Sequence, residues 1–284
     1  MTPSIIEQFI QSKKGNPALC EDGLFVGEHF IAVVDGVTGK GMVPWNWDED
    51  GDGRNAETGI TSGRFARNVL LSALKRLPMD IDSASAITFL NNSLTQTIGS
   101  RMKSLIDCLE ERPQAVIILY SAFYREIWAF GDCQCMINDT VFTHSKKIDS
   151  LMAQARCLYN EIELILGTSI ADLEKNDSGR QAILPLLRRQ LSLANAASPY
   201  GYDVLDGFSI HPERTVIHQV SPGAQVILAS DGYPALKPTL AESEEALKML
   251  IEKDPLCIHE NKGTKGLQND CLSFDDRTYI RFMA

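Results

Sequence analysis

The chain has 284 residues, of which 44% are apolar and 23% charged, and it carries a formal net charge of −10 at pH 7. This apolar content is enough for a substantial core, and the charged fraction is ordinary for a soluble globular protein. The acidic balance argues against a nucleic-acid partner, because phosphate backbones require a basic face. It suits a protein that concentrates cations.

The N-terminal segment and the cysteines indicate the compartment. Residues 1–7 lack the basic segment and apolar run of a signal peptide, and no apolar stretch approaches the roughly 18 residues that a membrane span needs. The seven cysteines have no framework spacing. We therefore expect reduced thiols in a cytoplasmic protein that has no membrane partner and acts as a monomer.

Periodicity along the chain predicts alternating groups of strands and helices. Expected strands are 24–26, 30–34, 114–120, 122–130, 133–142, 215–220, 224–230 and 278–282, and expected helices are 59–77, 83–110, 145–166, 178–196 and 242–252. Helices inserted in consecutive pairs between antiparallel strands are typical of an α+β fold. No linker or repeat divides the chain, so we expect one domain over residues 1–284.

Acidic residues stand at the ends of several of these strands. Phe30–Val34 runs into Asp35-Gly36, Ala224–Ser230 runs into Asp231-Gly232, Asp275-Asp276 precedes the last strand, and Glu21-Asp22 precedes the first. Asp-Gly is also a common turn sequence, which explains any one pair on its own. Carboxylates held rigidly at strand ends are, however, what a hard divalent cation requires. The pattern predicts a Mg²⁺ or Mn²⁺ site drawn from four distant parts of the chain.

The order and spacing of these motifs over nearly the whole chain resemble those of the metal-dependent type-2C (PPM-type) protein serine/threonine phosphatases. The matching segments are Glu21-Asp22, Ala32–Gly36, Thr61–Ala66, Ala129–Cys133, Leu228–Gly232 and Asp275–Ile280. The resemblance implies an αββα sandwich, in which two antiparallel β-sheets are flanked by helix pairs. It also implies hydrolysis of phosphoserine or phosphothreonine in a phosphorylated protein substrate.

The same resemblance implies a centre of two Mg²⁺ or Mn²⁺ ions with catalysis by a metal-activated water. The implied protein ligands are Asp35 as the bridging carboxylate, the Gly36 carbonyl, Asp231 and Asp275 for one ion, and Glu21 with Asp22 for the other, directly or through water. Asp132 matches a residue that in relatives helps to hold a third ion. Asp35, Asp231 and Asp275 would thus be the catalytic side chains. Such ions neutralise phosphoryl oxygens and lower the pKa of a bound water toward about 7.

Three positions depart from the family pattern. Val37 replaces a histidine that is proposed to protonate the leaving oxygen, and Asp276 stands where Asn is usual. The phosphate-binding arginine is missing from the first loop, where Lys13 or Lys14 could contact phosphate as a point charge. The alternative function is therefore a catalytically weak phosphatase-like module that binds a phosphoprotein or a regulatory partner.

The loop over about 42–58 is acidic, and we expect it to form a flap beside the active site. Its segment Asp48–Gly53 resembles the start of an EF-hand loop, but the twelfth position is Gly59 and no helix precedes it. Trp45 and Trp47 are expected either to pack the flap down or to meet a substrate. Among the histidines, His144 and His218 lie near strand ends and remain open as proton donors.

Overall fold

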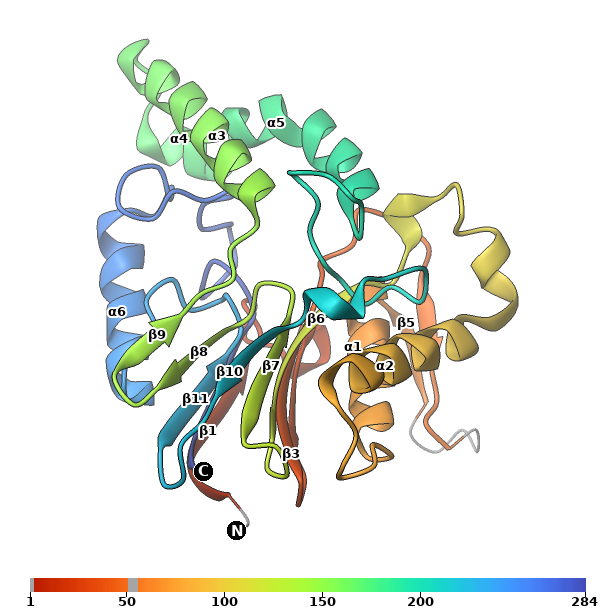
Figure 1. The fold of residues 1–284 in the computed structure, drawn as a ribbon. Coiled ribbons are helices and arrows are strands. Elements are labelled where there is room, and N and C mark those ends of the chain that lie inside the picture. The colour runs from red at the N-terminus through yellow and green to blue at the C-terminus, as the bar shows by residue number, and fades with distance from the viewer. Residues whose placement is uncertain (1–2, 51–55) are drawn as a thin grey trace.

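Two five-stranded antiparallel sheets form the centre of the fold in a computed structural model, which describes residues 3–50 and 56–284 (Figure 1). The first sheet has the order β1 (Ser4–Gln11), β12 (Arg277–Met283), β11 (Gln225–Ala229), β8 (Gln134–Ile137) and β9 (Thr140–Phe142). The second has the order β10 (Val216–Gln219), β7 (Glu126–Phe130), β6 (Ala115–Ser121), β3 (Phe30–Gly36) and β2 (Asp22–Val26).

Alternation along β3 shows how the two faces of a sheet are used. Ile31 and Val33 are buried in the core between the sheets, together with Leu228 and Ile280 from the facing sheet. The intervening Ala32, like Val34, contacts a second core under the helices. Because both faces are covered, residues 30–34 of β3 are all apolar, and the end of the strand can hold the Asp35 side chain rigidly.

Helices cover the outer faces of the sandwich. α1 (Ser62–Leu74) and α2 (Ser83–Ile98) pack on the second sheet, and α6 (Leu240–Lys253) lies beside the first. α3 (Lys147–Ile165), α4 (Ile170–Lys175) and α5 (Ser178–Arg189) lie together beyond one end of the strands, at the top of Figure 1. The predicted α+β class, with two antiparallel sheets and flanking helices, is confirmed. Among the described residues, α1 and α2 form the helix pair on the second sheet, and α6 covers the first.

Several predicted element boundaries differ from the structure. The second helix ends at Ile98 rather than near 110, because Gly99 has a φ of +54° that stops it, and short 3₁₀ turns follow. The first helix begins at Ser62, capped by the Thr61 side chain. Residues 133–142 form the two strands β8 and β9, and the fourth long helix, α5, ends at Arg189. Strand β1 and helix α4 were not predicted.

The expected acidic flap is a two-stranded sheet of β4 (Trp45–Trp47) and β5 (Glu57–Ile60) that packs on α1. The Trp45 ring lies 4.4 Å from the Phe65 ring and Trp47 meets Phe65 edge-on at 6.2 Å, so both tryptophans fasten the segment down. None of its described residues lines the cavity discussed below. Asp52 and Gly53 of the EF-hand comparison lie outside the described residues.

All seven cysteines are free, and Cys135 is buried in β8. Within residues 3–50 and 56–284, no helix combines the length and the apolar character that crossing a membrane requires.

Candidate active site

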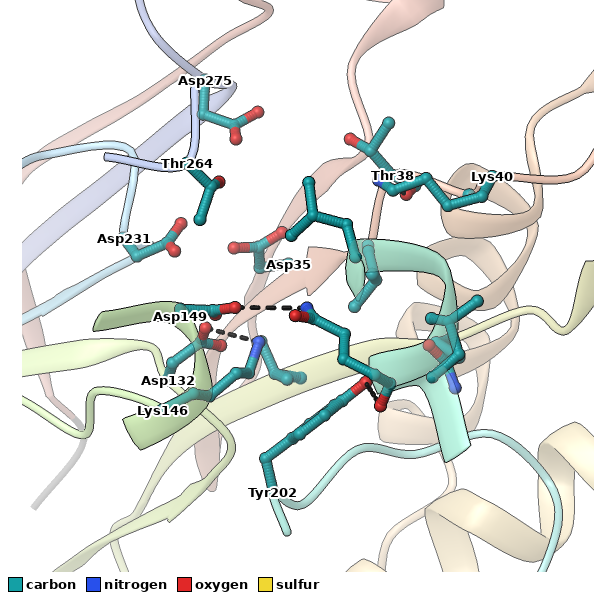
Figure 2. A pocket seen from close by; sticks show the side chains of 18 of the residues that line it. Asp35, Thr38, Lys40, Asp132, Lys146, Asp149, Tyr202, Asp231, Thr264 and Asp275 are labelled. Atoms are coloured by element: carbon teal, nitrogen blue, oxygen red, sulfur yellow. Dashed lines mark hydrogen bonds and ion pairs between the residues drawn. The ribbon is translucent and has the colours of Figure 1, made fainter. Parts of the chain in front are cut away.

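A cavity of about 190 Å³ lies where the ends of the central strands meet α5. Asp35, Asp132, Asp231 and Asp275 contribute to its lining, and Lys40 lies on the opposite side from Asp231 and Asp132 (Figure 2). A second cavity of about 540 Å³ shares three of these carboxylates and extends beneath α3. The strand ends that the sequence singled out therefore meet in one place.

The antiparallel register brings Asp22 and Asp35 together. Asp22, the first residue of β2, is paired with Asp35 near the end of β3. Side chains of paired residues lie on the same face of a sheet. Asp35 follows Ile31 and Val33 in the alternation, and this face is the one toward the other sheet. Both carboxylates therefore stand at the rim of the space between the sheets.

Asp22 connects the two sheets. Its Oδ2 accepts hydrogen bonds from Ser230 Oγ at 2.6 Å and from Thr278 Oγ1 at 2.9 Å, and both donors belong to the strand region of the first sheet. The carboxyl is almost fully buried, and burial raises its pKa to about 8 although the two hydroxyls act in the opposite direction. Asp22 thus holds Ser230, and with it the approach to Asp231, against β2.

The glycines of the two Asp-Gly motifs allow the backbone there to pack closely against a neighbouring backbone segment. Neither Gly36 nor Gly232 has a positive φ, so the motifs are not left-handed turns. A β-carbon at Gly36 would overlap the carbonyl oxygen of Gly63, at the start of α1, and one at Gly232 would overlap the carbonyl oxygen of Asp276. Glycine is required because the backbone beside each catalytic candidate is packed directly on another backbone.

Glu21 is buried beside this contact and is held by hydroxyl groups. Its two carboxylate oxygens accept from Thr38 Oγ1 and Thr61 Oγ1, each at 2.6 Å. Thr61 is also the N-cap of α1, so the helix end and the carboxylate are positioned together. Because both carboxylate oxygens already accept hydrogen bonds, Glu21 is suited to bind a cation through an intervening water rather than by direct contact.

Asp35 and Asp231 have no cationic side chain within ion-pair distance among the residues that the structure describes. Burial and the carboxylates of Asp22 and Asp231 raise the pKa of Asp35 well above its usual range. Asp231 borders the cavity, and its side chain is exposed there. Desolvation by the surrounding protein, followed by the charges of Asp132 and Asp275, raises its pKa to about 7. Crowded carboxyls of this kind lower their free energy by binding a cation.

Lysines engage the other two carboxylates of the cavity. Asp275 is paired with Lys13 at 2.8 Å and with Lys265. Although burial acts to raise it, the pKa of Asp275 is held well below its usual range by these two ammonium groups. Asp132 is paired with Lys146 at 2.6 Å, as Figure 2 shows. Two of the predicted metal ligands are therefore already neutralised by side chains.

Two further cations of the cavity have no carboxylate partner within the described part of the chain. Lys40 donates to the Thr38 carbonyl at 3.1 Å, and Arg180, on α5, donates to the Thr264 carbonyl at 2.7 Å. Burial, followed by the nearby charges of Arg180 and Lys265, lowers the pKa of Lys40 to about 8. These groups are available to an anion. Lys14, by contrast, is exposed and does not line the cavity.

The two histidines left open as proton donors contact each other. His144 Nε2 lies 3.0 Å from His218 Nε2, and His144 Nδ1 lies 2.6 Å from the Cys133 carbonyl oxygen. His144 borders the second cavity with Asp132 and Asp231. Burial and the neighbouring His144 lower the pKa of His218, which disfavours the protonated form of its imidazole.

The donor chemistry of the site suits a hard divalent ion. In the described residues, no group of three or more His, Cys, Asp or Glu side chains forms a ready-made metal cluster. Asp35 and Asp231, however, offer carboxylate oxygens to one cavity, and neither has a cationic partner among the described residues. Oxygen-only donors match Mg²⁺ and Mn²⁺. The residues therefore fit one such ion at Asp35 and Asp231 directly.

Sequence reasoning missed the cationic residues of the site. Lys146 precedes α3, Lys265 lies in the loop after α6, and Arg180 lies on α5. Nothing in their local sequence distinguishes them from solvated surface charges.

No family model matches the sequence, and no curated protein sequence matches it. Solved structures that match its fold include the Mycobacterium tuberculosis serine/threonine phosphatase PstP, also solved with two manganese ions (15% identity, TM-score 0.45, 98% of each chain). They also include the PPM Ser-Thr phosphatase MsPP from Mycobacterium smegmatis (13%, 0.45, 98% of each chain). RsbX in complex with magnesium matches at 11% identity and a TM-score of 0.45, over 99% of this chain and 98% of that one.

Proposed function

We propose that this protein is a Mg²⁺- or Mn²⁺-dependent phosphatase that removes phosphate from serine or threonine residues of proteins. The observation that carries the proposal is the composition of one cavity. Among the described residues, it combines two carboxyl groups that have no cationic partner, Asp35 and Asp231, with two cations that have no carboxylate partner, Lys40 and Arg180. A divalent cation and a phosphate group together complement both sets of charges.

Each side chain has a role in this proposal. Asp35 would be shared by two ions, the Gly36 carbonyl would bind one of them, and Asp231 would bind one. When bound, such an ion supplies an activated water and neutralises phosphoryl oxygens. As the family resemblance implies, Asp275 would join Asp231 on one ion, Glu21 with Asp22 would serve the other directly or through water, and Asp132 would help to hold a third.

Lys40 and Arg180 would contact the phosphate from the other side of the cavity. The arginine can offer a two-pronged donor and the lysine a point charge. They would replace the arginine that is absent from the first loop. Lys13, one of the two lysines first considered for this role, is already paired with Asp275.

The whole chain would act as one cytoplasmic monomer. Strand β1 pairs with β12, which unites the two ends of the chain in one sheet and supports a single domain over residues 1–284. The free cysteines are in keeping with a reducing compartment.

The test is hydrolysis of p-nitrophenyl phosphate and of a phosphoserine peptide by the purified protein with Mn²⁺. We expect turnover that stops with EDTA and returns with added Mn²⁺. Asp231→Asn should lower kcat by at least about a hundredfold, as expected when a metal ligand is lost. Asp139→Asn, in the exposed turn between β8 and β9, is the matched control. Turnover that survives thorough chelation would exclude the metal-dependent mechanism.

The second candidate is a phosphatase-like module that binds a phosphoprotein or regulatory partner with little turnover. The lysine pairs on Asp275 and Asp132, together with Val37 in the cavity wall, favour it. The two functions separate on one comparison. If wild type is no faster than Asp231→Asn with Mn²⁺ while both bind phosphopeptide, the binding module is correct.

A further inference from the structure

Helix α3 lies at the outside of the helical layer, and one of its faces is apolar although it is exposed to solvent (Figure 1). The exposed side chains that form its outward row are Leu151, Ala155, Leu158, Ile162 and Ile165. Exposure reaches 64% at Leu158 and 81% at Ile165. A single exposed leucine is ordinary, whereas a contiguous apolar row marks an interaction surface.

The opposite face of α3 already has its partners within the fold. Cys157 and Asn160 are buried, and Asn160 Oδ1 accepts from the Gly179 N–H of α5 at 2.9 Å. The fully buried Arg156 donates to the Leu256 carbonyl at 2.8 Å. The inward face therefore holds the helix in place, and packing within the domain does not explain the outward row.

The spacing of the outward row indicates the shape of its partner. From Leu151 to Ile165 the row advances in steps of four, three, four and three residues. This is the a/d pattern with which one helix receives the side chains of another. An extended segment repeats its side chains every two residues and would not match it. The row covers about 21 Å of helix at about 1.5 Å per residue, so the occupant that fits is a second helix.

A groove of about 670 Å³ lies beside the row. Its lining comes from α3, with Ala155, Leu158 and Glu161, and from the segment after α6, with Ile258, His259 and Lys262. A helix laid along α3 could place side chains in this groove, as in the binding of amphipathic helices by other proteins.

Two glutamates flank the row. At about 3.6 residues per turn, Glu161 and Glu163 lie on opposite sides of it. Glu161 lies 3.1 Å from His259, and Glu163 accepts from Thr168 Oγ1 at 3.1 Å. Among the described residues, neither glutamate forms an ion pair with a lysine or arginine. Basic side chains on a docked helix would therefore complement both flanks.

A second copy of the chain would complement them poorly. The cations of α3 are Lys147, at its first residue, and Arg156, which is buried. Another α3 therefore offers no compensating charge near Glu161 and Glu163. Two copies would also bring together net charges of −10 each, which disfavours their association.

We propose that the outward row of α3 is a docking site for an amphipathic helix of another protein, with apolar residues at heptad spacing and basic residues on its flanks. The inference is independent of the proposed function, because none of these residues contacts an ion or a phosphate in that proposal. Asp149 and Ala153, on the inward side of α3, line the second cavity. The docked helix would thus lie on the outside of one wall of the active site.

The probe is a synthetic peptide of about three heptads with isoleucine at a, leucine at d and lysine at e and g. Its lysines repel one another, so the peptide alone should remain unfolded and monomeric. We expect it to become helical on binding the full-length protein, which circular dichroism detects, while calorimetry gives the Kd. A peptide with the same apolar residues but glutamate at e and g should bind at least about tenfold more weakly, which equals about 1.4 kcal/mol.

Leu158→Ser/Ile165→Ser should weaken binding of the lysine peptide at least about tenfold. Met249→Ser is the matched control, because Met249 is a half-exposed apolar residue on α6, and it should bind as wild type. Since Leu158 and Ile165 are largely exposed, the urea midpoint of Leu158→Ser/Ile165→Ser should equal that of wild type. A loss of binding is then not a loss of folding.

Glu161→Gln/Glu163→Gln should reduce the difference in affinity between the lysine and glutamate peptides. Glu245→Gln/Glu252→Gln removes the same number of charges from exposed positions of α6 and should leave that difference unchanged. This comparison separates contact with the flanks of α3 from general attraction to an acidic protein.

The docking site is disproved if the lysine peptide fails to bind wild type at about 1 mM. It is also disproved if Leu158→Ser/Ile165→Ser binds that peptide as wild type does. A wild-type dimer in sedimentation that Leu158→Ser/Ile165→Ser dissociates would assign the row to a second copy instead. Hydrolysis of phosphomonoesters is measured separately, so the proposed function can fail while the docking site stands, and the reverse.

Discussion

Asp22 and Asp35 are opposite each other across β2 and β3, at the position where one strand begins and the other nears its end. Two carboxylates on one face of a sheet repel each other unless a proton or a cation intervenes. Ser230 and Thr278 donate to Asp22, while Asp35 has no such donor among the described residues. Asp35 is therefore the member of the pair that depends most on an added cation.

Asp35→Asn should abolish the strongest Mn²⁺ site without weakening the metal-free fold. The amide keeps the size of the carboxyl but cannot ionise. Burial, followed by Asp22 and Asp231, raises the pKa of Asp35, so the metal-free fold already disfavours the ionised form. We expect Mn²⁺ affinity to fall at least about a hundredfold in calorimetry, as for loss of a charged ligand. The metal-free Tm should stay equal to that of wild type or rise. Asp231→Asn should be partly rescued by high Mn²⁺. Near wild-type Mn²⁺ binding by Asp35→Asn would show that the central strand is wrongly assigned.

Asp276 stands where the family has asparagine. Its hydrogen bonds explain why this position needs a carboxylate rather than an amide. Oδ1 accepts from Lys13 N–H at 2.8 Å and Oδ2 accepts from Glu21 N–H at 2.7 Å. Both oxygens are needed as acceptors, and an amide would present N–H to one of these donors. The residue therefore fixes the backbones that carry Lys13 and Glu21.

Asp276→Asn should lower the free energy of unfolding by about 1–3 kcal/mol, because one buried N–H loses its acceptor. The urea midpoint measures this change, with Asp139→Asn as the exposed control. An unchanged midpoint would mean that the two backbone N–H groups find other acceptors, and that the carboxylate at position 276 has no structural role.

Asp206 predicts a pH effect away from the metal ligands. It is almost fully buried, its Oδ1 accepts from Phe208 N–H at 2.9 Å, and Arg112 lies 3.6 Å from Oδ2. Burial raises its pKa to about 6, above the unfolded value of about 4. The folded state thus favours the protonated carboxyl. That contribution to stability is complete below about pH 4 and is lost as the pH rises to about 6.

Asp206→Asn should consequently gain stability relative to wild type as the pH rises from 4.5 to 7.5. A shift of about two units corresponds to a gain of about 2–3 kcal/mol. Urea unfolding at the two pH values measures it. A difference between the proteins that does not change with pH would mean that Asp206 titrates normally in the fold.

The positions of the carboxylates could be predicted from the sequence because they depend on local rules. Phe30–Val34 is apolar at every position, so it must be a strand covered on both faces, and the residue that follows must lie at the rim. The sequence also shows a glycine in each Asp-Gly pair, but the close backbone contact that requires this glycine could not be predicted from the sequence. At Gly36 the cause is the start of α1, 27 residues further along the chain at Gly63.

The cations could not be predicted, since each depends on packing between distant segments. Lys265 meets Asp275 only because Arg156 and Arg180 hold its loop against α3 and α5. Strand β1 was missed for a related reason. It lies at the edge of its sheet, with exposed Ile6 and Ile10 beside half-buried polar residues, so its alternation is weak.

Lys146 forms a largely buried ion pair with Asp132 at the edge of the cavity. Its ammonium lies 2.6 Å from Asp132 Oδ2, and the two side chains are 14% and 11% exposed. The Tyr202 ring lies 5.3 Å from the same ammonium. Although burial acts to lower it, Asp132 and Asp149 raise the pKa of Lys146, so the group stays charged. The lysine occupies the place next to Asp132 where the family resemblance implied a third ion.

Lys146→Met should lower the free energy of unfolding by about 3 kcal/mol, because a largely buried carboxylate is left without its partner. Lys146→Met/Asp132→Asn should recover most of this loss, since no charge then remains unpaired. Mn²⁺ should raise the Tm of Lys146→Met more than that of wild type, as Asp132 becomes free to hold a cation. Lys147→Met, at the next and exposed position, is the control. If Lys146→Met is as stable as wild type and gains no more from Mn²⁺, then Asp132 does not depend on this lysine, and the third-ion position is open in the native protein.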